Sequence, residues 1–182
     1  MKPWEIEEKS FEILSKELGN RSFPPLHEPV IKRAIHATAD FDYADILRIS
    51  GRAIEEGIKA IKGGYNIVTD TRMAASGINK KVLSRFGGEV VCFMDDEEVA
   101  VEANRRQVTR ASICMEKASK NPKNRIFVIG NSPTALISLC ELIKRGEIDP
   151  ALIIGVPVGF VNVVESKELL KQSGVPYIIS EG

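Results

Sequence analysis

The sequence predicts an α/β fold: a doubly wound, mainly parallel five-stranded sheet with helices on both faces and an N-terminal helical segment. Two apolar runs carry this prediction, because each ends at a glycine and leads into a loop of small residues, at 125–130 and 151–155. Short β-branched runs of this kind are typical of buried parallel strands. Ligands of open α/β sheets bind beyond the carboxyl ends of such strands, so the two loops are the first candidates for a binding site.

Helix signals dominate the first third of the chain. In the first of them, apolar side chains recur at spacings of three and four, and Gly19 ends the run. In the third, Ile54, Ile58 and Ile61 form the side that we expect to be buried. Residues 46–49 fit either a short edge strand or a turn of helix. Helices are expected at residues 4–18, 29–39 and 52–62.

Strand and helix signals alternate from residue 66 onward, which is the pattern of parallel βαβ units. Asp95 and Asp96 place carboxylates at the start of a long helix, where the helix dipole favours them. No linker or repeat interrupts the chain, so residues 1–182 are expected to form a single domain. The expected strands are residues 66–69, 89–94, 125–130, 151–155 and 177–179, and the other expected helices are 79–86, 133–144 and 165–173.

Composition and charge argue against several classes of protein. The chain has 25 basic and 25 acidic residues, whereas nonspecific binding of nucleic acid needs a strong excess of positive charge. No apolar run approaches the ~20 residues of a membrane span, and the acidic start lacks the apolar stretch of a secretory signal. Cys92, Cys114 and Cys140 have no metal-ligand spacing, so we expect reduced core thiols, no metal site and a cytoplasmic location.

The loop at 130–134 predicts an anion site. Pro133 fits the first turn of a helix, and the free N–H groups nearby then point at whatever lies above the strand end. Asn131 or Ser132 could instead serve only as a helix cap, and that alternative stays open. The loop has neither a G-x-G-x-x-G pattern nor a Walker-type lysine, so it does not indicate a nucleotide phosphate.

The loop at 155–161 is almost wholly apolar, although loops are normally polar. Three interpretations stay open. A second subunit could cover the loop, the loop could line a pocket for a large, flat and mostly hydrophobic ligand, or the adjacent helices could simply bury it.

His36 is the candidate acid or base, because histidine titrates near neutral pH. It lies on the second expected helix with Asp40 one turn later, where a carboxylate could hold the imidazole. A solitary helical histidine can also be merely packed or solvated, as we expect for His27 in its proline-rich loop. Arginines such as Arg33 and Arg110 could bind the carboxylates of an acidic ligand in a fixed fork.

Seven short motifs follow one another along the chain, and together they resemble one family. They lie at residues 6–11, 33–38, 70–73 with 77–78, 109–110, 130–136, 155–161 and 165–167. In this order they are similar to the motifs of the precorrin-8X methylmutases, also called cobalt-precorrin-8 methylmutases, with Ser132 where the family has alanine. The family usually continues past the last strand with a C-terminal tail that this sequence, ending at Gly182, does not contain.

The resemblance implies an isomerase without a cofactor, which moves a methyl group from C-11 to C-12 of precorrin-8X or cobalt-precorrin-8. The product is hydrogenobyrinate or cobyrinate, in cobalamin biosynthesis. The resemblance also implies a homodimer and a catalytic role for His36, which would protonate the macrocycle near the migrating methyl. The residues expected to bind the tetrapyrrole are Ser10, Arg33, Thr38, Arg110, Asn131, Ser132, Thr134, Pro157, Val158, Gly159 and Phe160.

Two alternative functions stay open beside this one. The first is a non-catalytic protein that binds or carries a corrinoid, because the same residues would serve binding and catalysis. The second is a transferase that uses S-adenosylmethionine or a nucleotide. That reading requires a glycine-rich first loop and an acidic ribose ligand about 20 residues later, and neither is evident.

Overall fold

The computed structural model describes residues 2–181, and its contacts divide them into two compact units. The first unit comprises residues 2–48 and 180–181, and the second comprises residues 49–179. The expectation of a single domain over residues 1–182 stays a prediction. No helix within residues 2–181 combines the length and the hydrophobicity that a bilayer crossing needs.

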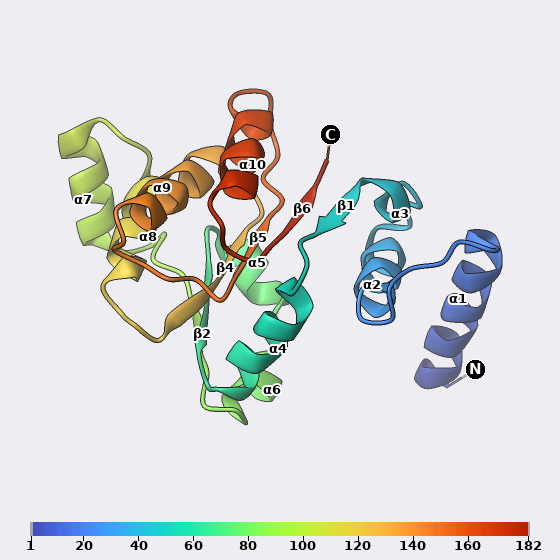
Figure 1. The fold of residues 1–182 in the computed structure, drawn as a ribbon. Coiled ribbons are helices and arrows are strands. Elements are labelled where there is room, and N and C mark those ends of the chain that lie inside the picture. Colours follow the sequence, from blue (N-terminus) through green and yellow to red (C-terminus); the bar gives the residue numbers. More distant parts are fainter. Residues whose placement is uncertain (1, 182) are drawn as a thin grey trace. The chain divides into compact units, whose positions relative to one another are not determined.

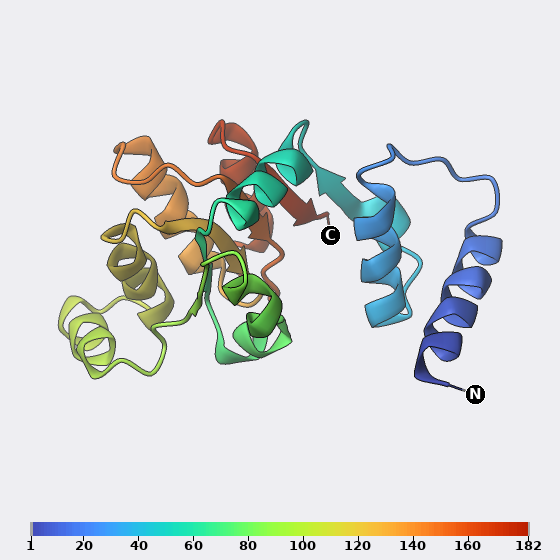
Figure 2. The same ribbon diagram turned by 90° about the horizontal axis from the view of Figure 1, so that it is seen from below.

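The first unit is built on two helices, α1 (Pro3–Leu18) and α2 (Glu28–Thr38), which lie side by side in Figure 2. Both were predicted. Their contact buries one side of each helix, with Leu14, Leu18, Ile31 and Ile35. Gly19 ends α1 as expected, and α2 ends at Thr38 because the next residue, Ala39, is in the left-handed conformation (φ 56°). The short helix α3 (Tyr43–Ile46) follows.

The sheet has six strands in the order β1-β6-β5-β4-β2-β3, one strand more than the sequence predicted. The additional strand, β1, occupies the edge and resolves the ambiguity at residues 46–49, because α3 ends at Ile46 and the strand starts at Leu47. The pairs β2–β3, β2–β4, β4–β5 and β5–β6 are all parallel. The strands are β1 Leu47–Ile49, β2 Asn66–Thr69, β3 Val90–Val91, β4 Asn124–Ile129, β5 Leu152–Gly155 and β6 Tyr177–Ser180.

Helices cover both faces of the sheet in the second unit (Figure 1). Val68, Phe127 and Ile153 lie in one row of the register and belong to the main core. That core also contains residues of α7 (Glu97–Arg106), α8 (Arg110–Ser119), α9 (Pro133–Lys144) and α10 (Val163–Gln172). Helices therefore cover this face of the sheet, as the predicted doubly wound fold requires.

The opposite row of the sheet, with Ile67, Ile126 and Leu152, faces the helix α4 (Ala53–Lys62). Gly57 permits this contact, because a Cβ atom there would lie only 2.8 Å from Leu152 Cδ2. The buried side of α4 is formed by Ala53, Ile54, Gly57 and Ala60. Ile58, which the sequence placed on that side, is exposed, so that part of the prediction was wrong.

The structure differs from the predicted elements at three places. The expected long helix after Asp96 is two helices, because Gln107 adopts a left-handed conformation (φ 55°) that ends α7, and Thr109 then caps α8. A short helix, α5 (Arg72–Gly77), precedes the predicted α6 (Lys80–Ser84), and the sequence reading overlooked it. In addition, only Val90–Val91 of the expected strand 89–94 pair in the sheet.

Candidate functional site

The imidazole of His36 lies on the ring of Phe11. The two ring centroids are 4.9 Å apart and the planes differ by 13°, so the rings are stacked. Phe11 comes from α1 and His36 from α2, so the packing of these two helices sets the plane of the imidazole. His36 is half-buried, and neither ring nitrogen has a hydrogen-bond partner within residues 2–181. Both nitrogens are therefore available to a ligand.

Asp40 does not hold the imidazole, contrary to the expectation from the sequence. The helix α2 ends at Thr38, so Asp40 lies beyond the helical turn that the i, i+4 spacing assumed. Its carboxylate accepts the backbone N–H of Asp42 at 2.9 Å, and no hydrogen bond or ion pair joins it to His36 in the described chain. The aromatic ring of Phe11, rather than a carboxylate, positions the histidine.

The other predicted site residues of the first unit lie on the same two helices. The guanidinium of Arg33 lies 5.0 Å from the centroid of the Phe11 ring and forms an exposed ion pair with Glu7, with 3.0 Å between N and O. The hydroxyls of Ser10 and Thr38 each donate to the carbonyl four residues earlier, at 2.8 Å. The structure thus groups Arg33 and His36 around Phe11, a residue of the motif at 6–11 to which the sequence assigned no role in the site.

At the carboxyl edge of the sheet, the turn after β4 binds an anion, and this anion is the carboxylate of Asp70. The backbone N–H of Gly130 donates to Oδ1 at 3.0 Å, and those of Asn131 and Ser132 donate to Oδ2 at 2.8 and 2.7 Å. Asp70 is only 1% exposed and follows β2 directly. The loop geometry predicted from the sequence is therefore present, but these three N–H groups are already bound within the protein.

Four hydroxyl groups form a chain between the starts of α8 and α9. Thr109 Oγ1 lies 2.7 Å from Thr134 Oγ1 and 3.0 Å from Ser112 Oγ, and Thr134 Oγ1 lies 2.8 Å from Ser132 Oγ. Thr109 also caps α8 by accepting the N–H of Ser112. Ser132 and Thr134 were predicted as site residues, whereas Thr109 and Ser112 were not.

Arg110 is the first residue of α8 and is exposed. Within the described residues its guanidinium has no hydrogen-bond or ion-pair partner, although most arginines of the chain are paired with a carboxylate. The side chain of Asn131 is also exposed and without a hydrogen-bond partner in residues 2–181. These two side chains can therefore contact a ligand without first breaking an internal bond.

The apolar loop after β5 is largely exposed. Pro157 is buried, but Val158, Phe160 and Val161 are 63%, 106% and 74% exposed. The interpretation that adjacent helices bury the loop is therefore wrong for residues 158–161. Two interpretations of the loop remain: a second subunit covers it, or a large hydrophobic ligand does.

Lys167 on α10 is 4% exposed, and this burial lowers the pKa of its amino group.

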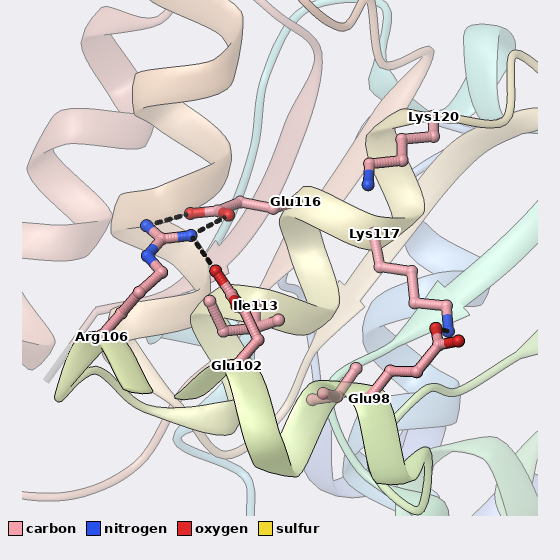
Figure 3. Close-up of a pocket in the computed structure, with 8 residues that line it drawn as sticks. Glu98, Glu102, Arg106, Ile113, Glu116, Lys117 and Lys120 are labelled. Carbon is pink, nitrogen blue, oxygen red and sulfur yellow. Dashed lines mark hydrogen bonds and ion pairs between the residues drawn. The ribbon is translucent and has the colours of Figure 1, made fainter. Parts of the chain in front are cut away.

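A cavity of about 440 Å³ between α7 and α8 is lined mainly by charged side chains, as Figure 3 shows. Arg106 donates to both oxygens of Glu116, and this bond raises the pKa of Arg106. Lys117 is paired with Asp96 and Glu98 at 2.8 and 2.9 Å. None of the predicted site residues lines this cavity, and its ion pairs join α7 to α8. We assign it a structural role.

The cysteines are free thiols in the structure. Burial raises the pKa of Cys114 to about 12 and that of Cys140 to about 11, so both thiols stay protonated at neutral pH. Cys92 is half-buried. Within residues 2–181, no group of three or more histidine, cysteine, aspartate or glutamate side chains is arranged to hold a metal ion.

The predicted site residues thus form one group in each unit. Ser10, Arg33, His36 and Thr38 lie on α1 and α2, and the remaining ones lie at the carboxyl edge of the sheet in the second unit. The sequence reading missed the contacts of Glu7, Phe11, Asp70, Thr109 and Ser112. Four of these five residues lie inside the motifs at 6–11, 70–73 and 109–110, which was the one available signal.

Comparison with known proteins identifies the family of this chain. A family model described as precorrin-8X methylmutase (CbiC) matches residues 5–182. The chain is 44% identical to the cobalt-precorrin-8 methylmutase of Priestia megaterium, over all of this chain and 81% of that protein. It is 45% identical to the one from Leptospira interrogans, over 97% of this chain and 84% of the relative.

A solved structure agrees with the sequence matches. The precorrin-8X methyl mutase from Thermus thermophilus is 44% identical and superposes with a TM-score of 0.88, covering 97% of this chain and 87% of that one. The enzymes in these comparisons are methylmutases, which are isomerases. The chain belongs to the precorrin-8X methylmutase family.

Proposed function

We propose that this protein catalyses the methyl shift from C-11 to C-12 of the tetrapyrrole macrocycle, converting cobalt-precorrin-8 to cobyrinate. The observation that carries the proposal is the His36 imidazole, which the Phe11 ring orients and whose nitrogens are unoccupied, in a chain of the methylmutase family. The relatives from Priestia megaterium and Leptospira interrogans favour the cobalt-bearing substrate, since both are named for it.

His36 acts as the acid in this proposal. It donates a proton to the macrocycle near the migrating methyl group, and this protonation favours the shift. Substrate and product are isomers, so the proton leaves the macrocycle after the methyl group has moved and the histidine is restored. A positioned acid contributes roughly 10²–10⁴-fold in rate, and the remaining acceleration comes from holding the macrocycle in a reactive conformation.

The second unit binds the substrate in this proposal. The macrocycle of the substrate carries many acetate and propionate arms, and the unpaired guanidinium of Arg110 is suited to a carboxylate. The side chains of Asn131, Ser132 and Thr134 offer further polar groups at the same edge. The exposed apolar residues Val158 and Phe160 are suited to the face of the macrocycle. Ser10, Arg33, Thr38, Pro157 and Gly159 complete the proposed set.

We further propose that the protein is a cytoplasmic homodimer. The exposed apolar loop at 158–161 supports a subunit boundary near the site, because isolated surfaces rarely expose such a patch. Light scattering on the purified protein tests this assembly. A dimer mass is expected, and a monomer mass at micromolar concentration contradicts it.

An isomerisation assay tests the function. Purified protein is mixed with cobalt-precorrin-8 or with metal-free precorrin-8X, and the absorbance of the macrocycle is followed with no other cofactor present. We expect the cobalt form to be converted to cobyrinate. The absorbance of the macrocycle should then change, because the product has a more conjugated ring system. Tight binding of cobyrinate without conversion of either substrate would indicate a carrier instead. Conversion of the metal-free form alone would contradict the cobalt assignment.

A further inference from the structure

The carboxylate of Asp70 has no role in the function proposed above, although it accepts three hydrogen bonds at the candidate site. Three consecutive N–H groups, from Gly130 to Ser132, donate to its two oxygens at 2.7–3.0 Å. Its own backbone N–H donates to the Val128 carbonyl at 3.2 Å, which continues the β2–β4 pairing beyond Thr69. Asp70 therefore joins the ends of two neighbouring strands to the start of α9.

This arrangement decides which atoms of the loop can meet a ligand. The start of a helix attracts anions, and here the anion is the buried carboxylate of the protein itself. A substrate carboxylate cannot bind the same N–H groups without displacing Asp70. The side chains of the turn remain available: that of Asn131 is exposed without a hydrogen-bond partner in the described chain, and those of Ser132 and Thr134 are half-buried.

The position of the turn also affects the neighbouring helix. Ser132 and Thr134 are linked through their hydroxyls to Thr109, which caps α8 directly before Arg110. A displacement of the turn at 130–132 would therefore be transmitted to the start of α8. The hydrogen bonds of Asp70 are thus continued through Ser132 and Thr134 to Thr109, the residue directly before Arg110.

We infer that Asp70 is a positioning residue of the substrate site: by filling the anion-binding turn at 130–132, it fixes the side chains that recognise the substrate carboxylates. The inference rests on the proposed function and deepens it. Recognition at this edge of the sheet proceeds through the side chains of Asn131, Ser132, Thr134 and Arg110 rather than through backbone N–H groups.

The amino end of the same strand provides a matched control. Asn66 is 5% exposed, accepts the N–H of Glu89 at 3.0 Å and donates to Asn124 Oδ1 at 3.0 Å, so it also bridges β2 and β4. Asn124 in turn donates to the Ala118 carbonyl. These two side chains thus bond to each other and to backbone groups, and neither is a proposed binding residue. Loss of Asn66 should therefore affect stability without affecting recognition.

The first experiment compares Asp70→Asn with Asn66→Ala. The new amide NH₂ must face one of the N–H donors of the turn, which displaces the turn with little change in volume. For Asp70→Asn we expect the Kd for cobyrinate, measured by absorbance titration of folded protein, to rise by up to about 10²-fold, with kcat unchanged at saturation. For Asn66→Ala we expect a lower Tm and an unchanged Kd.

A double-mutant cycle then asks whether Asp70 acts through the turn. Asn131→Ala should weaken cobyrinate binding in the wild type but have little further effect beside Asp70→Asn, because neighbours in one network are not additive. Backbone amide exchange at residues 130–132 should be faster in Asp70→Asn than in the wild type.

The outcomes separate this inference from the proposed function. If the wild type converts cobalt-precorrin-8 while Asp70→Asn binds cobyrinate with unchanged Kd, or if the two mutations are additive, the positioning role of Asp70 is refuted and the function stands. If the wild type neither binds nor converts the macrocycle, the function is refuted, and the inference falls with it. An equal rise in Kd for Asn66→Ala would reduce the role of Asp70 to general stability and would also overturn the inference.

Discussion

The α1–α2 pair and the carboxyl edge of the parallel sheet hold their polar groups in opposite ways. The imidazole of His36 has no hydrogen-bond partner within residues 2–181, and an aromatic ring sets its plane. At the sheet edge, three N–H groups bind Asp70, and the hydroxyls of Ser132 and Thr134 bond to each other. The first arrangement leaves both nitrogens of the His36 ring without an internal partner. The second holds the polar groups of the edge in fixed positions, which suits them to the proposed binding of the substrate.

This contrast assigns different kinetic effects to the two regions. Residues that act only in the transition state change kcat, whereas residues that bind substrate and transition state equally change KM or Kd. We therefore expect substitutions around His36 to lower kcat and substitutions at the sheet edge to raise Kd. Four substitutions test this division, and they follow in order of decreasing expected effect.

Replacement of His36 by alanine should have the largest effect. We expect kcat to fall by about 10²–10⁴-fold, while the Kd for cobyrinate changes little. The fold should persist, because the side chain is half-buried and forms no hydrogen bond in the described structure. Absorbance assays of turnover and titrations of product measure the two quantities. His27→Ala, at the other histidine of the chain, is the control and should retain wild-type kcat. Wild-type turnover in His36→Ala would remove His36 from the mechanism.

Replacement of Arg110 by alanine should act on binding alone. A hydrogen bond to a charged group contributes about 1.5–3 kcal/mol, which corresponds to a Kd for cobyrinate roughly ten- to a hundredfold higher. Arg110 has no internal partner, so the Tm should not fall. The matched control is Arg105→Ala on α7, where the guanidinium is exposed and already paired with Glu102. An unchanged Kd in Arg110→Ala would exclude Arg110 from the recognition of the carboxylate arms.

Phe160→Ser tests which partner covers the exposed loop after β5. If the ring of Phe160 packs on the macrocycle, its loss removes about 1.5 kcal/mol of hydrophobic contact, and the Kd for cobyrinate rises roughly tenfold. We expect this result together with an unchanged mass in light scattering. Val101→Ser on α7 also removes an exposed apolar side chain and should have neither effect. A shift towards monomer with unchanged Kd would instead assign the side chain of Phe160 to the subunit contact.

Phe11→Leu should have the smallest effect of the four, and it should appear in kcat. Stacked aromatic pairs contribute about 0.5–1.5 kcal/mol beyond their buried area, so a less well-oriented imidazole should lower kcat by about threefold at constant Kd. Phe41→Leu, at an exposed phenylalanine of the same unit, is the control. A rise in Kd without loss of kcat would show that Phe11 contributes to substrate binding, and the division of kinetic effects between the two regions would then not hold.

The local sequence predicted most of the fold because its strands are short β-branched runs bounded by glycine or aspartate. The strand β2 and the helix α9 were found at their observed bounds. The errors arose where one residue departs from the periodic pattern. Gln107 adopts a left-handed conformation that interrupts the expected long helix, although its side chain carries no such signal. The helix α5 has only six residues, too few for a clear apolar period.

The site was harder to predict because its decisive contacts join distant parts of the chain. The bonds of Asp70 to Gly130, Asn131 and Ser132 span 60 to 62 residues, and they depend on β2 and β4 being neighbours, which the local pattern does not specify. The stacking of Phe11 on His36 depends in the same way on the packing of α1 against α2. Motif resemblance located these residues, and only the structure supplied their partners.

Arg110 occupies a position that is unfavourable for a cation. It is the first residue of α8, where the partial positive charge of the helix start repels a guanidinium by about 0.3–1 kcal/mol. An acidic residue there would raise the stability of the protein without ligand, but the proposed contact with a substrate carboxylate would be lost. Directed evolution that selects only for heat resistance of the unliganded enzyme would therefore discard Arg110 early, and consensus redesign of this helix should exempt it.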